Sequence, residues 1–248
     1  MKKKLKKILL VFLIIIIATC AGFLIYASSY YHASDDALQY LTKSGEGVTV
    51  TQEHDLITFT PDHITCGMIF YPGGKVACQA YAPLLYRCAQ KGILCIMPKM
   101  PLNLAVFGIN RADGLQKAYP DVTDWYIAGH SLGGSMAAVY VKDHADDYRG
   151  LILLASYSTE DLKNSGLSVL SVYGAEDHVL NLNSYAKYRK NLPDALTEKI
   201  IPGGCHSYFG TYGIQRGDGT PSISNDDQQE YTAALIAEWI NAVHPRTD

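Results

Sequence analysis

A serine flanked by glycines is the residue of this sequence best suited to chemistry. Ser131 lies in the run Gly129-His-Ser-Leu-Gly133, between an apolar, β-prone segment at 125–128 and a stretch of small, helix-compatible residues. A strand–turn–helix context of this kind presents a serine hydroxyl on a sharp turn. Glycines on either side remove Cβ atoms that would collide with the turn. We predict that Ser131 is a nucleophile, and the competing interpretation is a glycine-rich turn without chemistry.

A serine hydroxyl needs a base to take its proton and an acid to orient that base. Asp177 follows a predicted strand with a G-x-x-D spacing, and His206 follows the last predicted strand through a Gly-Gly turn. Nucleophile, acid and base in this chain order predict a triad of Ser131, Asp177 and His206. Glu176 and Asp161 remain alternative acids.

The other histidines of the predicted domain have weaker claims to be the base. His130 is the immediate neighbour of Ser131 and should point away from it. We expect a surface or loop role for His130, as for the remaining candidates His54, His63, His144 and His178.

An acyl-transfer site must also stabilise the oxyanion that develops on the attacked carbonyl. The backbone N–H of Leu132 directly follows the serine and begins a predicted helix, so it is one expected donor. The first strand-to-helix loop, residues 71–75, contains paired glycines that permit close backbone approach. We expect the second donor to be the N–H of Gly74 or Lys75; the alternatives are a plain turn or an anion-binding nest.

The substrate pocket is predicted from position alone. Residues 97–107 follow a strand at the active-site edge, and a packed connecting loop is an equally good interpretation of this segment. The glycine-rich stretch at 212–220 is interpreted as a rim loop, because one well-placed acid cannot build a calcium site. The candidate pocket residues are Met100, Leu102, Asn103 and Phe107, with Tyr71 and Tyr208 near the mouth.

These residues require a framework of alternating strands and helices. Two alternating segments at 48–52 and 56–60 predict an antiparallel hairpin. Continuous apolar strands separated by helices then predict an α/β fold, with a mainly parallel sheet covered by helices on both faces. Only residues 156–167 separate two of the strands, which is too short for a lid domain. Helices are expected at 77–90, 110–118, 132–144, 183–190 and 226–242, and the further strands at 66–71, 93–97, 151–155, 168–173 and 197–201.

The N-terminal segment differs from the rest. Five lysines within residues 1–7 precede nineteen uncharged residues at 8–26, a length at the lower edge of a membrane span. Lysines before the span and none just after it predict a cytoplasmic N-terminus. We predict a signal anchor at 8–26, a spacer at 27–46 and an extracytoplasmic domain at 47–248; secretion after signal cleavage is the alternative.

Charge and cysteine content limit the partners. Removing the five N-terminal lysines from the 21 basic residues leaves 16 against 24 acidic residues, which argues against nucleic acid as a ligand. Five cysteines fall in the predicted domain without C-x-x-C spacing, so the sequence indicates no metal site and no cofactor. Cys205 precedes the candidate catalytic histidine, and a redox role for it is a distant alternative.

Several stretches resemble the α/β hydrolases, and in detail the bacterial α/β-hydrolase fold-5 family. The resemblance implies the α/β-hydrolase fold and the triad Ser131, Asp177 and His206. Cys205 stands where the resemblance leads us to expect a polar residue such as asparagine. The matching stretches are Tyr-Pro-Gly-Gly-Lys-Val at 71–76, Ala-Tyr-Ala-Pro-Leu at 80–84, Met-Pro-Lys-Met-Pro-Leu-Asn-Leu-Ala at 97–105, Gly-His-Ser-Leu-Gly-Gly at 129–134 and Gly-Gly-Cys-His-Ser-Tyr-Phe-Gly at 203–210.

Together these features predict a membrane-anchored, extracytoplasmic serine hydrolase that acts on carboxylic esters through an acyl-enzyme. The expected substrate is a small molecule or a cell-envelope ester, with a short acyl group or a bulky carrier. A thioesterase, a peptidase or an acyltransferase would use the same machinery. A catalytically silent binding module is the alternative from another class.

Overall fold

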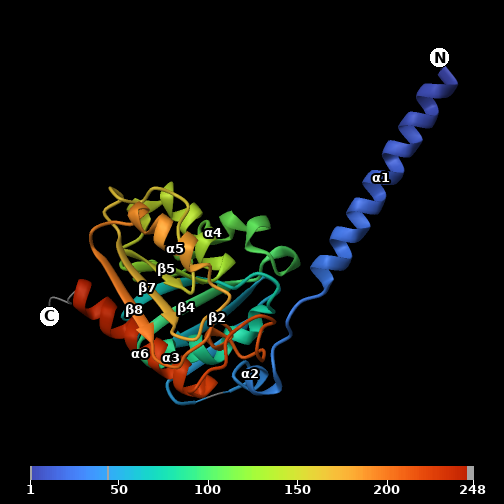
Figure 1. Ribbon diagram of the computed structural model, residues 1–248. Coiled ribbons are helices and arrows are strands. Elements are labelled where there is room, and N and C mark those ends of the chain that lie inside the picture. The colour runs from blue at the N-terminus through green and yellow to red at the C-terminus, as the bar shows by residue number, and fades with distance from the viewer. Residues whose placement is uncertain (1, 44, 245–248) are drawn as a thin grey trace. The chain divides into compact units, whose positions relative to one another are not determined.

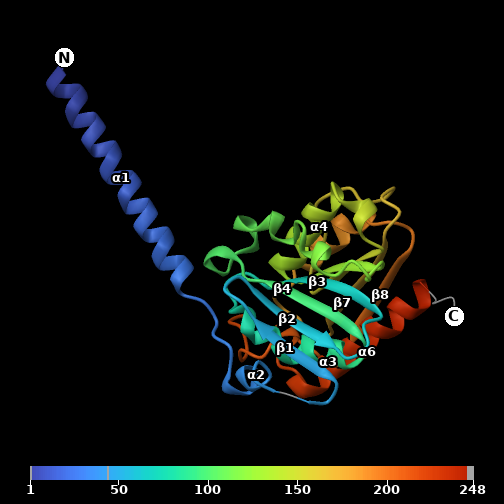
Figure 2. The ribbon, with the colours of Figure 1, turned by 180° about the vertical axis from the view of Figure 1, so that it is seen from behind.

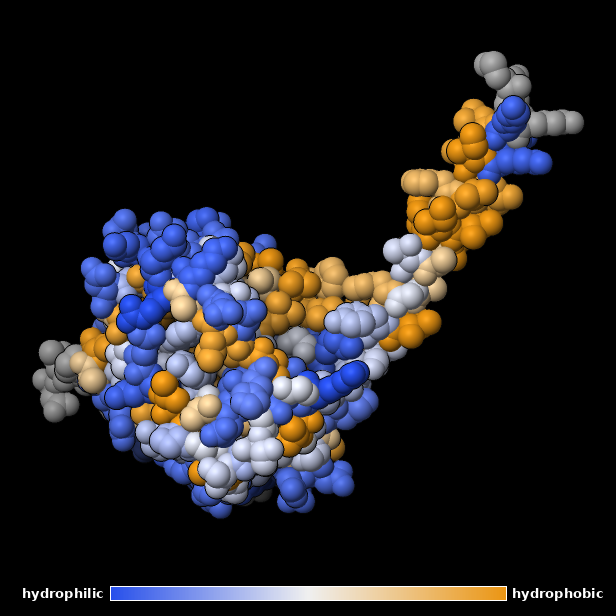
Figure 3. All heavy atoms as spheres, viewed as in Figure 1, coloured by the Kyte–Doolittle hydropathy of each residue, from blue (hydrophilic) through white to orange (hydrophobic). Residues whose placement is uncertain are grey.

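The computed structural model describes residues 2–43 and 45–244, so Met1 and residues 245–248 of the predicted domain lie outside the described part. The chain divides into two compact units between Tyr30 and Tyr31. The first is dominated by helix α1 (Lys2–Ser28). Its segment Lys4–Ser28 has a mean hydropathy of 3.2 and is long and apolar enough to cross a membrane, as are many signal sequences. Figure 3 shows the hydrophobic side chains that cover most of this helix.

The second unit is built on one eight-stranded sheet with the strand order β1-β2-β4-β3-β5-β6-β7-β8. The β1–β2 and β2–β4 pairs are antiparallel and the other pairs are parallel. This arrangement confirms the predicted fold class, including the leading hairpin. The strands are β1 (Val48–Gln52), β2 (Leu56–Pro61), β3 (Cys66–Tyr71), β4 (Ile93–Pro98), β5 (Trp125–His130), β6 (Gly150–Leu154), β7 (Ser168–Gly174) and β8 (Leu196–Ile201).

Helices cover both faces of the sheet. Figures 1 and 2 show α3 (Ala82–Gln90) and α6 (Asn225–Val243) on one face, with α4 (Leu132–Lys142) and α5 (Leu182–Tyr188) on the other. Every residue of β3 is buried, because its side chains alternate between two cores. Met68 and Phe70 belong to the core under α3 and α6, whereas Ile69 and Tyr71 belong to the core under α4.

One predicted helix is wrong. Residues 110–118 form two short 3-10 helices, Ile109–Ala112 and Leu115–Ala118, instead of one α-helix. Gly114 separates them with a φ of +73°, a left-handed conformation that ends a right-handed helix. The predicted helix at 77–90 likewise begins as a 3-10 turn, Cys78–Tyr81, before α3. Further 3-10 helices are Pro101–Asn103, Ala105–Phe107, Ala145–Asp147, Arg189–Asn191 and Ser207–Phe209.

The predicted spacer also differs from expectation. A short helix, α2 (Asp35–Gln39), is capped at its N-terminus by Ser34, whose hydroxyl accepts the N–H of Ala37. Ala37 and Leu41 are spaced four residues apart, and both are buried against the domain. Tyr31 pairs with Val76 as an isolated parallel bridge. The chain therefore packs on the domain from Tyr31 onward, earlier than residue 47.

Candidate active site

Ser131 lies on a strained turn between β5 and α4. Its φ of 52° and ψ of −124° fall in a region that side chains rarely adopt. Holding a residue there costs about 1–3 kcal/mol, so its surroundings must impose the conformation. The Ser131 N–H donates to Leu154 O at 2.9 Å, and the Ser156 hydroxyl donates to Ser131 O at 2.7 Å. These contacts with the end of β6 fix both sides of the serine.

The glycines of the turn allow close backbone approach. A Cβ at Gly133 would lie 2.2 Å from Tyr71 O and 2.3 Å from Pro72 O, and one at Gly129 would lie 2.5 Å from the Gly134 nitrogen. These distances are too short for any side chain. The requirement for glycine therefore comes from packing against the loop after β3 and against the first turn of α4.

Asp177 and His206 form a buried pair at the ends of β7 and β8. His206 Nδ1 lies 2.9 Å from Asp177 Oδ2, and the two side chains are 2% and 0% exposed. The other oxygen, Oδ1, accepts the N–H groups of Val179 at 2.9 Å and Leu180 at 2.7 Å. The carboxylate is thus held in one orientation and can fix the tautomer of the imidazole.

This arrangement leaves one ring nitrogen of His206 available. When Nδ1 donates to Asp177, a neutral imidazole presents a lone pair at Nε2. That Nε2 atom is buried and has no hydrogen-bond partner among the described residues. His206 and Ser131 line the same cavity without a direct hydrogen bond between them. Such contacts often tighten only when substrate binds.

The two alternative acids lie elsewhere. The Asp161 carboxylate accepts the N–H of Lys163 within its own loop. Glu176 is half-buried, and its backbone N–H donates to Gly204 O. The carboxylate in contact with His206 belongs to Asp177.

A second carboxylate, that of Asp218, contacts the backbone of His206, and this role was not predicted from the sequence. Its Oδ2 accepts the Ser207 N–H at 2.8 Å and the Ser207 hydroxyl at 2.6 Å. Its Oδ1 accepts the N–H of Gly219 at 2.9 Å, of His206 at 3.2 Å and of His178 at 3.4 Å. Burial raises the pKa of Asp218, but hydrogen bonds from Ser207, Gly219 and His206 outweigh it and leave the pKa below its ordinary value. The rim loop therefore braces the backbone that carries His206.

His130 is buried, contrary to the expected surface or loop role. Its ring centroid lies 4.5 Å from that of His206, and its Nδ1 lies 2.8 Å from Tyr81 Oη. Tyr81 Oη also accepts the Gly73 N–H at 3.0 Å, so the hydroxyl proton is left for His130 Nδ1. Burial, and then the nearby His206, hold the pKa of His130 well below its ordinary value. His130 is a neutral spacer between the histidine and the loop after β3.

The loop after β3 lies against the elbow. A Cβ at Gly74 would meet the Leu132 side chain at 2.7 Å, which places Gly74 beside the first residue of α4. The Lys75 N–H donates to Asn103 O at 2.7 Å. This bond occupies the Lys75 N–H, so the expectation that Lys75 supplies an oxyanion donor is wrong. Of the two candidates in this loop, the N–H of Gly74 is left as the second donor.

The cavity beside Ser131 has a volume of about 230 Å³. Its wall combines apolar residues with the polar side chains of Ser135, Ser156, Tyr157 and Asn181. The Ser135 hydroxyl donates to Tyr157 O at 2.8 Å. The remaining lining residues are Leu132, Ala155, Val179, Leu180 and His206.

The cavity contains none of the six predicted pocket residues. Tyr71 is fully buried, and its hydroxyl accepts the Ala112 N–H at 3.1 Å. Met100 packs in the core under α4, and Asn103 holds the Lys75 N–H. Leu102 and Phe107 are 44% and 52% exposed, and Tyr208 is half-buried after His206. The segment at 97–107 follows β4 at the carboxyl edge of the sheet, whereas the lining of the cavity comes mainly from the start of α4 and from the segments that follow β6 and β7.

The Cys205 thiol is poorly suited to redox chemistry. Burial raises its pKa to about 12, so the reactive thiolate is suppressed. Its backbone is clamped instead, because Gln228 Oε1 accepts the Cys205 N–H at 2.9 Å and Gln228 Nε2 donates to Cys205 O at 2.8 Å. Among residues 2–43 and 45–244, no group of three or more metal-ligating side chains is assembled.

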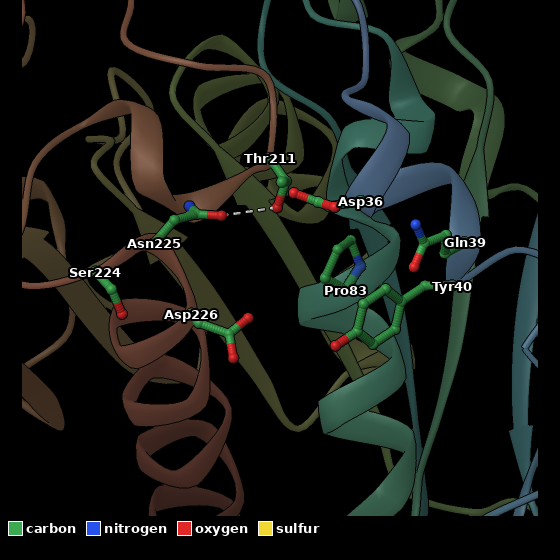
Figure 4. Close-up of a pocket in the computed structure, with 8 residues that line it drawn as sticks. All are labelled: Asp36, Gln39, Tyr40, Pro83, Thr211, Ser224, Asn225 and Asp226. Carbon is green, nitrogen blue, oxygen red and sulfur yellow. Dashed lines mark hydrogen bonds between the residues drawn. The ribbon is translucent and has the colours of Figure 1, made fainter.

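A larger cavity, of about 440 Å³, lies away from Ser131 between α2, α3 and the N-terminus of α6. Figure 4 shows its polar wall, where Thr211 and Asn225 are joined by a hydrogen bond. Asp226, on the same wall, is paired with Arg87 at 2.6 Å. This cavity holds neither a histidine nor an activated nucleophile, so the smaller cavity is the candidate active site.

A mainly parallel sheet with a serine on the β5–α4 turn has the architecture of the α/β hydrolases. Residues 67–230 match the model described as the alpha/beta hydrolase family, which is more than half of the chain. The chain therefore belongs to this family. A search of the curated proteins gave no match.

Solved structures share the fold. A predicted CIB-like hydrolase from Thermoplasma acidophilum has a TM-score of 0.57 and 17% identity, with 77% of this chain and 100% of that chain covered. A bacterial membrane phospholipase A has a TM-score of 0.60 and 12% identity over 97% and 100%. A thermophilic esterase from Thermogutta terrifontis has a TM-score of 0.56 and 12% identity over 79% and 98%. At these identities the likeness shows the fold.

Proposed function

We propose that this chain is a serine hydrolase in which Ser131 attacks a carbonyl carbon, His206 moves the proton and Asp177 orients the histidine. The observation that carries the proposal is the buried Asp177–His206 pair, whose histidine lines the same cavity as the strained Ser131. His206 Nε2 accepts the Ser131 proton as Oγ bonds to the carbonyl, and then delivers it to the leaving group. Water next attacks the acyl-enzyme and gives its proton to His206, which returns it to Ser131 Oγ as the bond between Oγ and the acyl carbon breaks and the acid is released.

The proposed oxyanion hole is formed by the N–H groups of Leu132 and Gly74. Leu132 begins α4, where the helix leaves its first N–H groups without partners inside the helix. The close approach of Gly74 to Leu132 supports a pair of donors aimed at one oxygen. The hydrogen bond that the neighbouring Gly73 N–H donates to Tyr81 Oη supports a fixed geometry for this loop.

The proposed reaction is carboxylic ester hydrolysis. A cavity of about 230 Å³ with serine, tyrosine and asparagine on its wall suits a short acyl group better than a long chain. A thioester, a peptide or an acyl group moved to a second alcohol would use the same residues. Hydrolysis rates for p-nitrophenyl acetate, butyrate, octanoate and palmitate test the short-chain preference, and a preference for palmitate would contradict it.

The proposed location is the outer side of a membrane, with α1 as an uncleaved signal anchor. The five lysines before the apolar segment support a cytoplasmic N-terminus. A phosphatase reporter joined to the C-terminus should be active only outside the cytoplasm. Retention of the full 27.2 kDa mass in the membrane fraction would support the anchor, and a shorter product in the medium would support cleavage.

Labelling with a fluorophosphonate probe tests the nucleophile directly. We expect the wild type to be labelled and Ser131→Ala and His206→Ala to remain unlabelled. Ser135→Ala is the matched control, because Ser135 lines the same cavity and should leave labelling intact. A folded wild type that is not labelled would reject the hydrolase proposal in favour of a binding module. Labelling that persists in Ser131→Ala would mean that another residue is the nucleophile.

A further inference from the structure

Tyr31 contacts both the loop after β3 and the rim loop that follows His206, at the point where the chain from α1 enters the domain. Its N–H donates to Lys75 O at 2.8 Å, and its carbonyl accepts the Ala77 N–H at 2.9 Å, so it is paired with the loop after β3. Its hydroxyl accepts the Arg216 N–H at 3.0 Å, and its ring lies 5.5 Å from that of Tyr212. Tyr31 is therefore fixed between these two loops.

The chain between the helix and this fixed point is short. Helix α1 ends at Ser28, and only Ser29 and Tyr30 separate it from Tyr31. Successive Cα atoms are 3.8 Å apart, so three steps span no more than about 11 Å. This limit holds for any direction that α1 takes. If α1 spans a bilayer, the edge of the sheet that carries the site must stay close to the membrane surface.

The same edge carries exposed hydrophobic side chains. We define the apolar rim as Leu102, Val106, Phe107 and Ile214, which are 44%, 41%, 52% and 47% exposed. The first three lie in the segment that Asn103 joins to Lys75, beside the partner of Tyr31. Ile214 lies in the rim loop between Tyr212 and Arg216, both of which contact Tyr31. The apolar rim thus lies in two segments, one joined to Lys75 and the other in contact with Tyr31, the residue at which the chain from α1 enters the domain.

We propose that the apolar rim rests in the interfacial layer of the bilayer, and that the active site takes amphiphilic carboxylic esters directly from the membrane. This inference rests on the proposed anchoring and ester hydrolysis. A short acyl group would enter the cavity beside Ser131, while the lipid-like alcohol stays in the bilayer. Clustered apolar side chains at an interface lose contact with water on docking, and the short tether removes most of the entropic cost.

Fluorescence of a label on the rim tests the docking independently of catalysis. The full chain with Cys20→Ser retains only buried thiols, because Cys20 is the exposed one of the six cysteines. Phe107→Cys and the control Tyr231→Cys, on α6 and 45% exposed, each accept an environment-sensitive dye. In phosphatidylcholine vesicles we expect the dye at 107 to shift to the blue and to be quenched by brominated lipid, unlike the dye at 231.

Kinetics test whether docking delivers substrate. One variant is Val106→Asn/Phe107→Asn, and the matched control is Ile64→Asn/Tyr231→Asn, whose residues are 39% and 45% exposed. The substrates are p-nitrophenyl acetate in water and 1,2-dialkyl-3-acetylglycerol in the vesicles. We expect the rim variant to lose about fivefold or more in rate on the embedded ester, because two apolar side chains that docking would bury in the bilayer are replaced by polar ones. The rate on the soluble ester should not change. The control should change neither rate.

The outcomes separate this inference from the proposals beneath it. If the protein co-sediments with vesicles but the dye at 107 stays in water, the docking is overturned and the hydrolase proposal is unaffected. Protein that stays out of the vesicle pellet would overturn the anchor and with it the docking. Equal losses on both esters in the rim variant would indicate damage to the site and would also overturn the inference. Failure of wild type to cleave either ester, with the dye buried, would reject the hydrolase proposal and the delivery of esters while supporting the docked rim.

Discussion

Replacing Asp218 with asparagine should weaken the candidate site without changing a residue of the proposed triad. Asparagine keeps one acceptor oxygen, but its NH₂ group cannot accept the two bonds that Ser207 makes to Oδ2 at 2.8 and 2.6 Å. Each hydrogen bond to a charged group contributes about 1.5–3 kcal/mol. Because Asp218 is only partly buried, we take the lower value and expect a loss of about 3 kcal/mol. For a domain of this size that corresponds to a fall in Tm of about 6–12 °C.

The loss should depend on pH in a defined direction. The pKa of Asp218 in the folded protein lies below its ordinary value. The carboxylate therefore stabilises the fold fully above the unfolded pKa of about 3.9, and this stabilisation disappears as the pH falls through the lower folded value. The difference in unfolding free energy between wild type and Asp218→Asn should be largest near neutral pH and should shrink in acid.

Catalysis should fall as well, because Asp218 accepts the backbone N–H of His206. A small displacement of a catalytic group costs up to about 100-fold in rate, so we expect kcat to fall by 10- to 100-fold. The assay is ester hydrolysis with urea unfolding at pH 7 and pH 3. Asp121→Asn, at an exposed position, is the control. Ser207→Ala completes a double-mutant cycle that measures the coupling.

Two results would refute this reasoning. If Asp218→Asn unfolds with the same free energy and kcat as wild type, the carboxylate does not brace the histidine. If stability falls while kcat and its pH profile are unchanged in the folded enzyme, Asp218 is structural only. Additive effects of the Asp218 and Ser207 substitutions would show that the two groups do not act on one another.

Three further substitutions test other contacts. Asp177→Asn should lower kcat by about 10⁴-fold with little change in fold, because an amide at Oδ2 favours the wrong tautomer of His206; labelling and hydrolysis rates check this, and a loss below tenfold would contradict the role. Tyr81→Phe should lower kcat/KM about tenfold by leaving the Gly73 N–H without its partner, and unchanged kinetics would argue against a braced oxyanion loop. Gly133→Ala should cost more than about 3 kcal/mol, measured by urea unfolding, because its methyl group would lie 2.2 Å from Tyr71 O.

The fold and the residues of the candidate site could be identified from the sequence because their determinants are local. Continuous apolar strands, their spacing and the glycines around Ser131 each leave a short-range pattern in the sequence. Chain order then places Asp177 and His206 at the carboxyl ends of neighbouring strands, and the structure brings these two side chains to 2.9 Å. The helix predicted at 110–118 does not form as one α-helix, because Gly114 adopts a left-handed conformation within it.

Contacts between distant segments could not be predicted. Asp218 lies in a loop whose sequence is typical of an ordinary glycine-rich turn. Its carboxylate nevertheless accepts hydrogen bonds from the backbone N–H groups of residues 178, 206 and 207. Gln228 on α6 clamps Cys205, which explains how the histidine loop is held without the polar residue expected at 205. No local pattern encodes such pairings, because they depend on how the loops return to the sheet edge.

The same close contacts serve stability and reactivity at the elbow. Gly133 approaches the carbonyls of Tyr71 and Pro72, so the start of α4 is pressed against the loop that leads to Gly74. The proposed oxyanion donors therefore cannot move apart without opening this packing. Tyr81 and His130 hold the same loop from its other side through the Gly73 N–H. The contacts that impose the strained conformation of Ser131 thus also set its distance from the proposed oxyanion donors. Substitutions that relax this strain should therefore lower activity as well.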